Sequence, residues 1–79
     1  EQTIKKALWF DDFHIAYLLS DGNFYITELD NRNGRNTLTP VPDKIDDFWI
    51  DSSANKNFPI MYYIKENQLF MIDWNNTGN

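Results

Sequence analysis

The chain has 79 residues, of which 42% are hydrophobic and 16% aromatic, a composition that excludes a disordered polymer and suits one small domain. Its formal net charge of −5 argues against generic binding to nucleic acid, which requires clustered lysine and arginine. It contains no cysteine, which excludes disulfides and thiolate zinc sites, and no apolar run approaches the roughly 18 residues of a transmembrane helix. We therefore expect no nucleic-acid partner, no transmembrane segment in this chain, no metal and no cofactor.

Short segments rich in Ile, Leu, Phe, Tyr and Trp alternate with the turn-forming residues Asn, Asp and Gly, which is typical of many short β-strands. No window keeps the spacing of three and four residues that an amphipathic helix requires. The pattern predicts an all-β fold. In chain order, the expected strands are residues 2–5, 7–10, 14–20, 23–30, 36–39, 47–50, 59–65 and 68–74.

The chain contains two diverged copies of one pattern. Residues 15–31 align without gaps with residues 60–76 at an offset of 45, and almost every apolar position meets an apolar position. Upstream, residues 8–11 align with residues 48–51 at an offset of 40, and the change of offset falls in the polar stretch SSANKNF. Because loops tolerate insertions, a shift confined to such a stretch indicates a structural repeat.

The second and third strands of each copy are separated by turn-forming residues. The turn of the first copy is Asp21-Gly22, and that of the second copy is Glu66-Asn67. Asp-Gly is favoured in two-residue hairpin turns because Gly accepts a positive φ angle. We therefore expect a two-residue turn in each copy.

A four-stranded unit needs one more strand in each copy. Residues 36–39 are suitable, because Pro40 follows them and proline fits the end or the edge of a strand. Residues 2–5 are their counterpart in the first copy. We therefore expect two four-stranded antiparallel units, formed by residues 1–35 and residues 36–79.

Several expected strands are apolar on both faces. The segments IAYLL, IMYYI and LFMI lack the alternation of a sheet with one wet face. Strands of this kind fit a sheet that is stacked between two neighbours. Two units alone would leave their outer faces bare, so the pattern predicts further units in the same polypeptide or self-assembly.

The stretch ALWFDDFHIAYLLSDGNFYITELD, residues 7–30, resembles the repeat of TolB-type and WD-like β-propellers. The likeness rests on Trp9, the Ile-Ala-Tyr strand at residues 15–17, the Gly-Asn turn at residues 22–23, and the Leu-Asp pair at residues 29–30. The resemblance implies that the two units are β-propeller blades, part of a larger or oligomeric propeller. It favours an extracytoplasmic location without deciding the compartment.

We expect a non-catalytic scaffold or protein-interaction segment, because nothing in the chain assembles a catalytic group. Its partner would be another protein or further copies of itself. Partners of such folds usually dock on loops at one face, so the turns, the linker and one strand end are the candidate contacts. These residues are Asp21, Asn23, Pro42, Asp43, Lys44, Glu66, Asn67 and Trp74.

Two alternatives come from other classes of protein. One is a module that binds glycans or another small ligand, with Trp74 and nearby asparagines in the site. The other is the propeller part of a larger hydrolase, because propellers host enzymes as well as binding proteins.

The remaining distinctive residues have plainer interpretations. Trp9 and Trp49 occupy equivalent strand positions, which favours packing between blades, whereas Trp74 ends a strand and is the better exposed candidate. His14 is the only histidine, so a structural role is expected. The paired carboxylates Asp11-Asp12 and Asp46-Asp47 are expected at solvated turns or edges.

Overall fold

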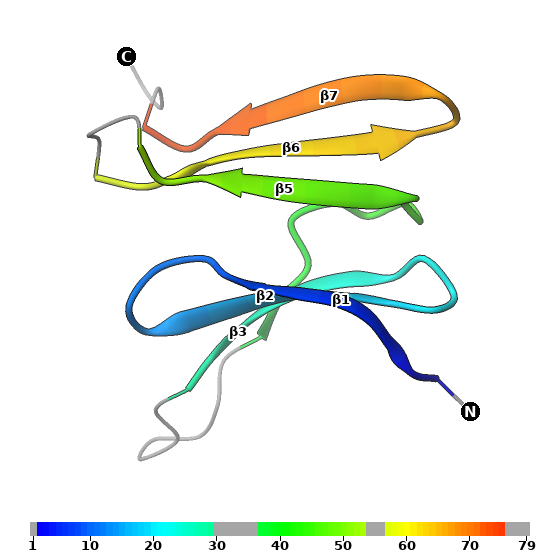
Figure 1. Cartoon of the computed structure of the whole chain (residues 1–79), viewed down its shortest axis with the longest axis horizontal. Coiled ribbons are helices and arrows are strands. Elements are labelled where there is room, and N and C mark those ends of the chain that lie inside the picture. The colour runs from blue at the N-terminus through cyan, green and yellow to red at the C-terminus, as the bar shows by residue number, and fades with distance from the viewer. Residues whose placement is uncertain (1, 30–36, 54–56, 76–79) are drawn as a thin grey trace.

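The structure is a computed structural model that describes residues 2–29, 37–53 and 57–75. Two antiparallel sheets account for all of the regular structure in these residues (Figure 1). No helix that could cross a membrane occurs among them. The expected all-β fold is therefore confirmed.

The first sheet has the strand order β1-β2-β3-β4 and the second has the order β5-β6-β7. The strands of the first sheet are β1 (Ile4–Trp9), β2 (His14–Leu19), β3 (Phe24–Glu28) and β4 (Thr37–Leu38). Those of the second sheet are β5 (Asp47–Asp51), β6 (Ile60–Lys65) and β7 (Gln68–Asp73). The three main strands expected for each copy are confirmed, with boundaries that differ by a few residues.

The expected outer strands are wrong in two respects. No separate strand covers residues 2–5, because β1 runs without interruption from Ile4 to Trp9. Strand β4 pairs with β3, with Leu38 opposite Ile26, and so belongs to the first sheet rather than to the second. It follows β3 in the chain and returns beside it, as consecutive strands usually do. The described part of the second sheet has three strands, and residue 36 of the expected fourth strand lies outside the described residues.

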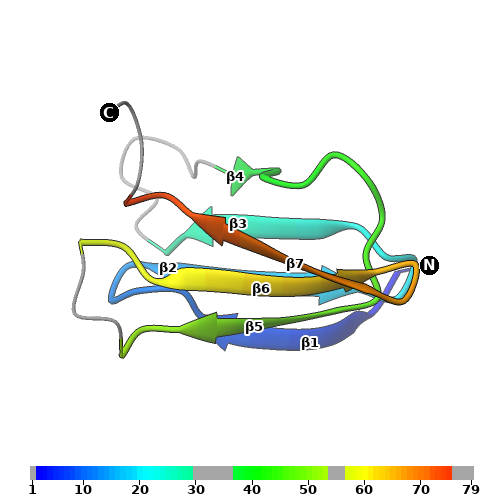
Figure 2. The same cartoon turned by 90° about the horizontal axis from the view of Figure 1, so that it is seen from above.

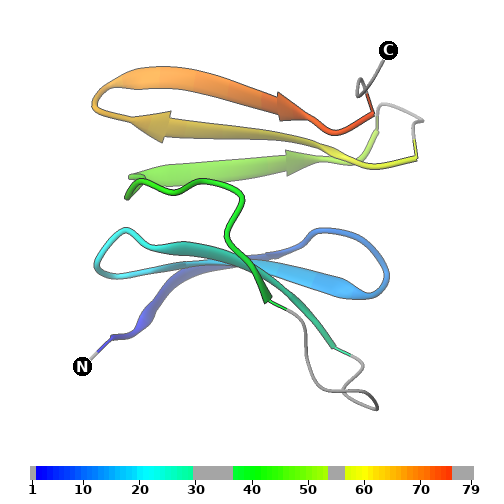
Figure 3. The same cartoon turned by 180° about the vertical axis from the view of Figure 1, so that it is seen from behind.

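The two sheets stack face to face, with β5 beside β1 (Figures 1 and 2). Strands β5, β6 and β7 run in the same directions as β1, β2 and β3, respectively (Figure 2). The linker of residues 39–46 crosses from the first sheet to the second, as seen from behind in Figure 3.

The hydrophobic core fills the space between the sheets. The rings of Phe24 and Phe48, one from each sheet, meet there edge to face with centroids 4.8 Å apart. Val41 and Ile45 come from the linker, which therefore closes the core as well as connecting the sheets. The buried hydrophobic residues are Phe10, Ala16, Leu18, Phe24, Ile26, Val41, Ile45, Phe48 and Met61.

The hairpin between β2 and β3 has a three-residue loop. Leu19 N donates to Asn23 O, and Gly22 N donates to Leu19 O, each at 2.9 Å. Gly22 has a φ of 95°, a conformation that residues with a Cβ rarely adopt. The two-residue turn expected at Asp21-Gly22 is therefore wrong, because the glycine forms a bulge after a turn that begins one residue earlier.

The hairpin between β6 and β7 has the expected two-residue turn. Lys65 pairs with Gln68, and Glu66 and Asn67 lie between them with φ angles of 53° and 64°. Positive φ at both central residues is the mark of a type I′ turn, whose twist matches the flanking strands.

The difference of one residue between the two loops changes which side chains enter the core. Ala16 and its aligned partner Met61 are both fully buried between the sheets. Phe24 is also buried, whereas its aligned partner Leu69 is 67% exposed on the outer face. A register shift of one residue turns every side chain of a strand to the other face. The ungapped alignment therefore pairs residues that both enter the core in β2 and β6, but not in β3 and β7.

A β-bulge in β1 directs two consecutive lysines toward the second sheet. Ile4 faces Leu19 and Lys6 faces Leu18, so Lys5 is an extra residue without an opposite partner on β2. In a regular strand, neighbouring side chains point to opposite faces. The bulge removes that alternation locally and allows both side chains to extend to β5.

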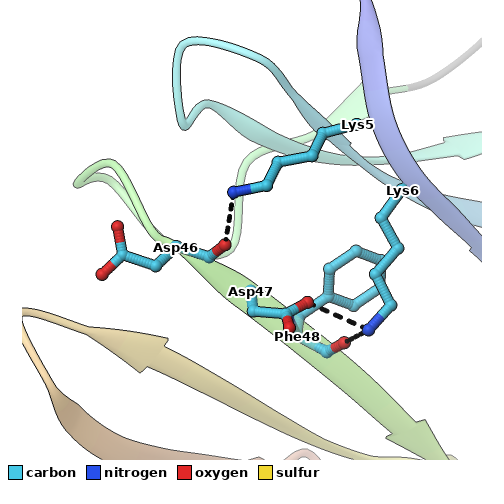
Figure 4. Close-up of polar contacts among 5 residues, drawn as sticks. All are labelled: Lys5, Lys6, Asp46, Asp47 and Phe48. Carbon is cyan, nitrogen blue, oxygen red and sulfur yellow. Dashed lines mark hydrogen bonds and ion pairs between the residues drawn. The ribbon is translucent and has the colours of Figure 1, made fainter.

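The two lysines bind the free edge of β5 (Figure 4). Lys5 Nζ donates to the carbonyl oxygen of Asp46 at 2.9 Å, and Lys6 Nζ donates to the carbonyl oxygen of Phe48. Lys6 Nζ also lies 3.0 Å from the carboxylate of Asp47. Unpaired carbonyl groups at a sheet edge invite pairing with another chain, so this contact joins the sheets and also protects that edge.

Candidate interaction surfaces

All candidate contact residues except Trp74 lie at one end of the sandwich, which we call the turn end: Asp21, Asn23, Pro42, Asp43, Lys44, Glu66 and Asn67. The linker contacts both turns there. Ile45 N donates to Gly22 O at 2.9 Å, and Glu66 N donates to a carboxylate oxygen of Asp46 at 3.3 Å. The structure therefore brings together the two turns and the linker, as the sequence predicts. Their role in binding stays a prediction.

The charges of the turn end are largely paired with one another. Lys44 Nζ lies 3.7 Å from the Asp21 carboxylate, and Lys65 donates a hydrogen bond to the Asp43 carboxylate. That hydrogen bond raises the pKa of Lys65. Exposed pairs of this kind contribute little to stability.

Trp74 does not belong to the turn end and is not an exposed platform. Its ring packs edge to face against Phe10, with centroids 5.3 Å apart, and it contacts the core cluster. The expectation that Trp74 is the most exposed tryptophan is therefore wrong. Because β7 follows the shorter loop, its C-terminal end turns Trp74 toward the first sheet.

Trp9 and Trp49 are more exposed than Trp74. They are 60% and 42% exposed on the outer faces, so they do not pack between these two sheets. Packing against further blades stays a prediction. Each follows an inward-facing residue in its strand and therefore points away from the shared core. Lys6 Nζ lies over the Trp49 ring, 4.6 Å from its centroid, and makes a cation–π contact with it.

The outer face of the second sheet is apolar. The strand register aligns Trp49, Tyr62 and Met71 in one row and Ile64 with Leu69 in the next. Leu69 is 67% exposed and Met71 is 58% exposed. We call this surface the B face: Trp49, Ile60, Tyr62, Ile64, Leu69 and Met71.

Carboxylates border the B face. Asp51 and Asp73 stand on either side of Ile60 in the row beyond Trp49, and Asp47 stands beside Ile64. Burial raises the pKa of Asp47, but hydrogen bonds from Lys6 and from the Phe48 backbone outweigh that effect and lower it overall. Hydrogen bonds from Ser53 lower the pKa of Asp51. Both groups therefore stay ionised, which gives the B face an acidic rim.

The outer face of the first sheet is apolar and carries no charged side chain in its central rows. Ala7, Tyr17 and Tyr25 form one row, and the two tyrosine rings lie 5.5 Å apart. Trp9 and Ile15 form the next row, followed by two threonines. We call this surface the A face: Ala7, Trp9, Ile15, Tyr17, Leu19 and Tyr25. Sequence reasoning anticipated two bare apolar faces but did not identify their residues.

No group of three or more His, Asp or Glu side chains is arranged to hold a metal ion among residues 2–29, 37–53 and 57–75. Comparison with known proteins gives no relative: no family model matches the chain, and no curated protein or solved structure matches it. The functional argument therefore rests on the surfaces of this structure alone.

Proposed function

We propose that this chain is a non-catalytic scaffold segment of the β-propeller type, whose A face and B face are covered by further β-sheets. These sheets belong to the same polypeptide or to further copies of the chain. The observation that carries the proposal is the pair of apolar outer faces. Monomeric soluble proteins rarely expose large contiguous apolar patches, so two apolar outer faces on a small domain favour covered faces.

The stacking geometry supports a repeated contact. Because corresponding strands of the two sheets run in the same directions, a third sheet stacked in the same manner would place its own A-type face on the B face (Figure 2). Contact between two different surfaces is heterologous, and such contacts form a closed ring when the rotation per unit divides a full turn. The acidic rim would then remain at the border, where water can reach Asp47 and Asp51.

The solution mass of the chain tests the proposal. We expect several copies by native mass spectrometry and by light scattering at micromolar concentration. Replacing Leu69 and Met71 together by lysine should yield the monomer, because these two side chains of the B face are 67% and 58% exposed. Gln68→Lys is the control for charge, since it adds one of the two positive charges of the double variant to the same strand beside the turn.

The result can contradict the proposal directly. A compact monomer at all concentrations, with the Leu69 and Met71 variant as soluble and as stable as the parent chain, would show that the B face needs no cover. Equal dissociation by Gln68→Lys would show that charge alone, rather than the loss of apolar contact, separates the copies.

A further inference from the structure

Among the described residues, the edges of β1, β4 and β5 are each protected against pairing with another chain. Strand β1 contains the bulge at Lys5. Strand β4 is only two residues long, and Pro40 follows it closely. At the free edge of β5, Lys5 and Lys6 bind the carbonyl oxygens of Asp46 and Phe48. Bulges, short strands and lysine side chains are the features by which natural proteins block such edges.

Strand β7, at the remaining edge of the second sheet, has none of these features. It spans six residues, Gln68–Asp73, without proline or lysine, and its pairing with β6 contains no bulge. Its first four residues are exposed. No strand of residues 2–29, 37–53 or 57–75 pairs with its other edge. A long, exposed apolar edge of this kind is a template for a further strand.

The two-residue turn before β7 determines which backbone groups lie on the free edge. In a β-turn the N–H of the fourth residue bonds to the C=O of the first, so the N–H of Gln68 points to Lys65 on β6. Because this direction alternates along an antiparallel pair, Phe70 also bonds to β6, whereas the N–H and C=O groups of Leu69 and Met71 point away from it. No backbone hydrogen bond to these outward groups occurs among the described residues. Their spacing matches the backbone of another extended strand.

The first sheet shows what kind of segment fits such an edge. There the corresponding edge of β3 is paired with β4, and Leu38 lies opposite Ile26. Ile72 of β7 corresponds to Ile26, since each lies opposite a fully buried residue of the middle strand. Ile26 is 2% exposed, whereas Ile72 is only half-buried. A strand paired with β7 would therefore flank Ile72 as β4 flanks Ile26.

A cavity of about 540 Å³ lies between the two sheets at the end opposite the turn end. Its wall is mostly apolar and includes Ile26, Leu38, Phe58 and Trp74. Figure 2, viewed along the stacking direction of the sheets, shows the C-terminal part of β7 over β3, with its free edge toward β4. An added strand would therefore lie over β4, and a side chain opposite Ile72 would face Leu38 across this space.

We propose that the free edge of β7 binds an extended segment of a partner protein by antiparallel strand addition. The backbone of the segment pairs with Leu69 and Met71, and its apolar side chains opposite these residues extend the B face. An apolar side chain opposite Ile72 enters the cavity. Main-chain hydrogen bonds supply the affinity, and the alternate side chains supply the specificity. The site is an edge rather than a face, so the inference does not rest on what covers the A face or the B face.

The peptide KTLVLVTK, with both termini blocked, is a suitable probe. In the antiparallel register its valines lie opposite Leu69 and Met71, and its leucines lie opposite Phe70 and Ile72. Isothermal titration calorimetry at pH 7 should show saturable binding at one site per chain. Methylating the backbone nitrogens of both valines removes the donors that face β7 and should weaken binding about tenfold or more. Methylating those of both leucines is the matched control, which should bind as the unmodified peptide does.

Amide hydrogen exchange and one pair of variants locate the peptide. In the free chain, the amides of Leu69 and Met71 should exchange rapidly and that of Phe70 slowly, and the peptide should slow the first two. Met71→Pro removes an outward N–H without removing a bond to β6, so the fold should persist while the peptide binds about tenfold more weakly. Met71→Ala keeps that N–H and should bind more tightly than Met71→Pro.

Three results would each overturn the proposal. The first is equal binding of the two methylated peptides, which would show that the backbone of the probe does not pair with β7. The second is protection of the Leu69 and Met71 amides in the free chain, which would show that this edge is already paired. The third is the absence of saturable binding at millimolar peptide.

Discussion

Replacing Gly22 by alanine tests how the linker and the first hairpin depend on each other. Gly22 has a φ of 95°, and a Cβ atom there would lie 2.9 Å from Lys44 Cβ and 3.3 Å from the carbonyl oxygen of Ile45. The left-handed conformation costs an alanine about 1–2 kcal/mol. The contact with the linker adds about 1–2 kcal/mol, because Lys44 Cβ is fixed to the backbone and cannot rotate away.

We therefore expect Gly22→Ala to lower the free energy of unfolding by about 2–4 kcal/mol, which is a large part of the stability of a small domain. Urea unfolding followed by tryptophan fluorescence measures the change as a lower midpoint at an unchanged slope. Asn67→Ala is the control for backbone conformation alone, since Asn67 has a φ of 64° in the other hairpin, and it should cost about 1 kcal/mol. If Gly22→Ala costs no more than this control, the close approach of the linker has no energetic consequence.

Three further predictions follow from the turns, the acidic rim and the core. The double change Glu66→Asn with Asn67→Gly should raise the free energy of unfolding by about 1 kcal/mol in urea unfolding, because Asn-Gly suits the two positive φ angles better; a lower midpoint would contradict the turn assignment. Asp47→Asn should cost less than about 1 kcal/mol at pH 7, since Asp47 is 41% exposed. Because folding lowers the pKa of Asp47, that cost is present above the ordinary value of 3.8 and disappears as the pH falls through the lowered pKa; a cost that persists in acid would refute the ion pair as its source. Phe48→Ala should cost about 3–5 kcal/mol in thermal or urea unfolding, because Phe48 is fully buried, whereas Trp9→Ala on the A face should cost much less in the monomer; equal costs would show that the A face is buried in solution.

The outer strands show why pattern alone misplaced an element. Residues 36–39 have the composition of a strand, and Thr37–Leu38 does form one. The sequence of a short strand does not indicate which strand it will pair with, since either sheet can satisfy its hydrogen bonds. The choice depends on where the linker leads the chain next, and here Pro40 and the residues after it carry the chain from the edge of β3 to the second sheet.

The tryptophans show that equivalent positions in the sequence do not identify the buried face. Equivalent positions in the sequence suggested that Trp9 and Trp49 have equivalent surroundings, and they do, but on the outer faces. Only the faces that the two sheets present to each other determine which half of each alternating strand is buried. The cavity lined by Phe58 and Trp74 is likewise absent from the sequence pattern, because it joins residues of both sheets that no short motif connects.

The sequence by itself determined the strands and the all-β class, because alternation, β-branched and aromatic residues and turn formers act within a few residues of one another. It also determined that the apolar side chains exceed what two sheets can bury between them. The tertiary structure decided the sheet to which β4 belongs, the faces that meet, and the contact of the two lysines with the edge of β5. Two small local features have these large effects. The extra loop residue at Gly22 decides which face of β3 is buried, and the bulge at Lys5 directs two lysine side chains toward the second sheet.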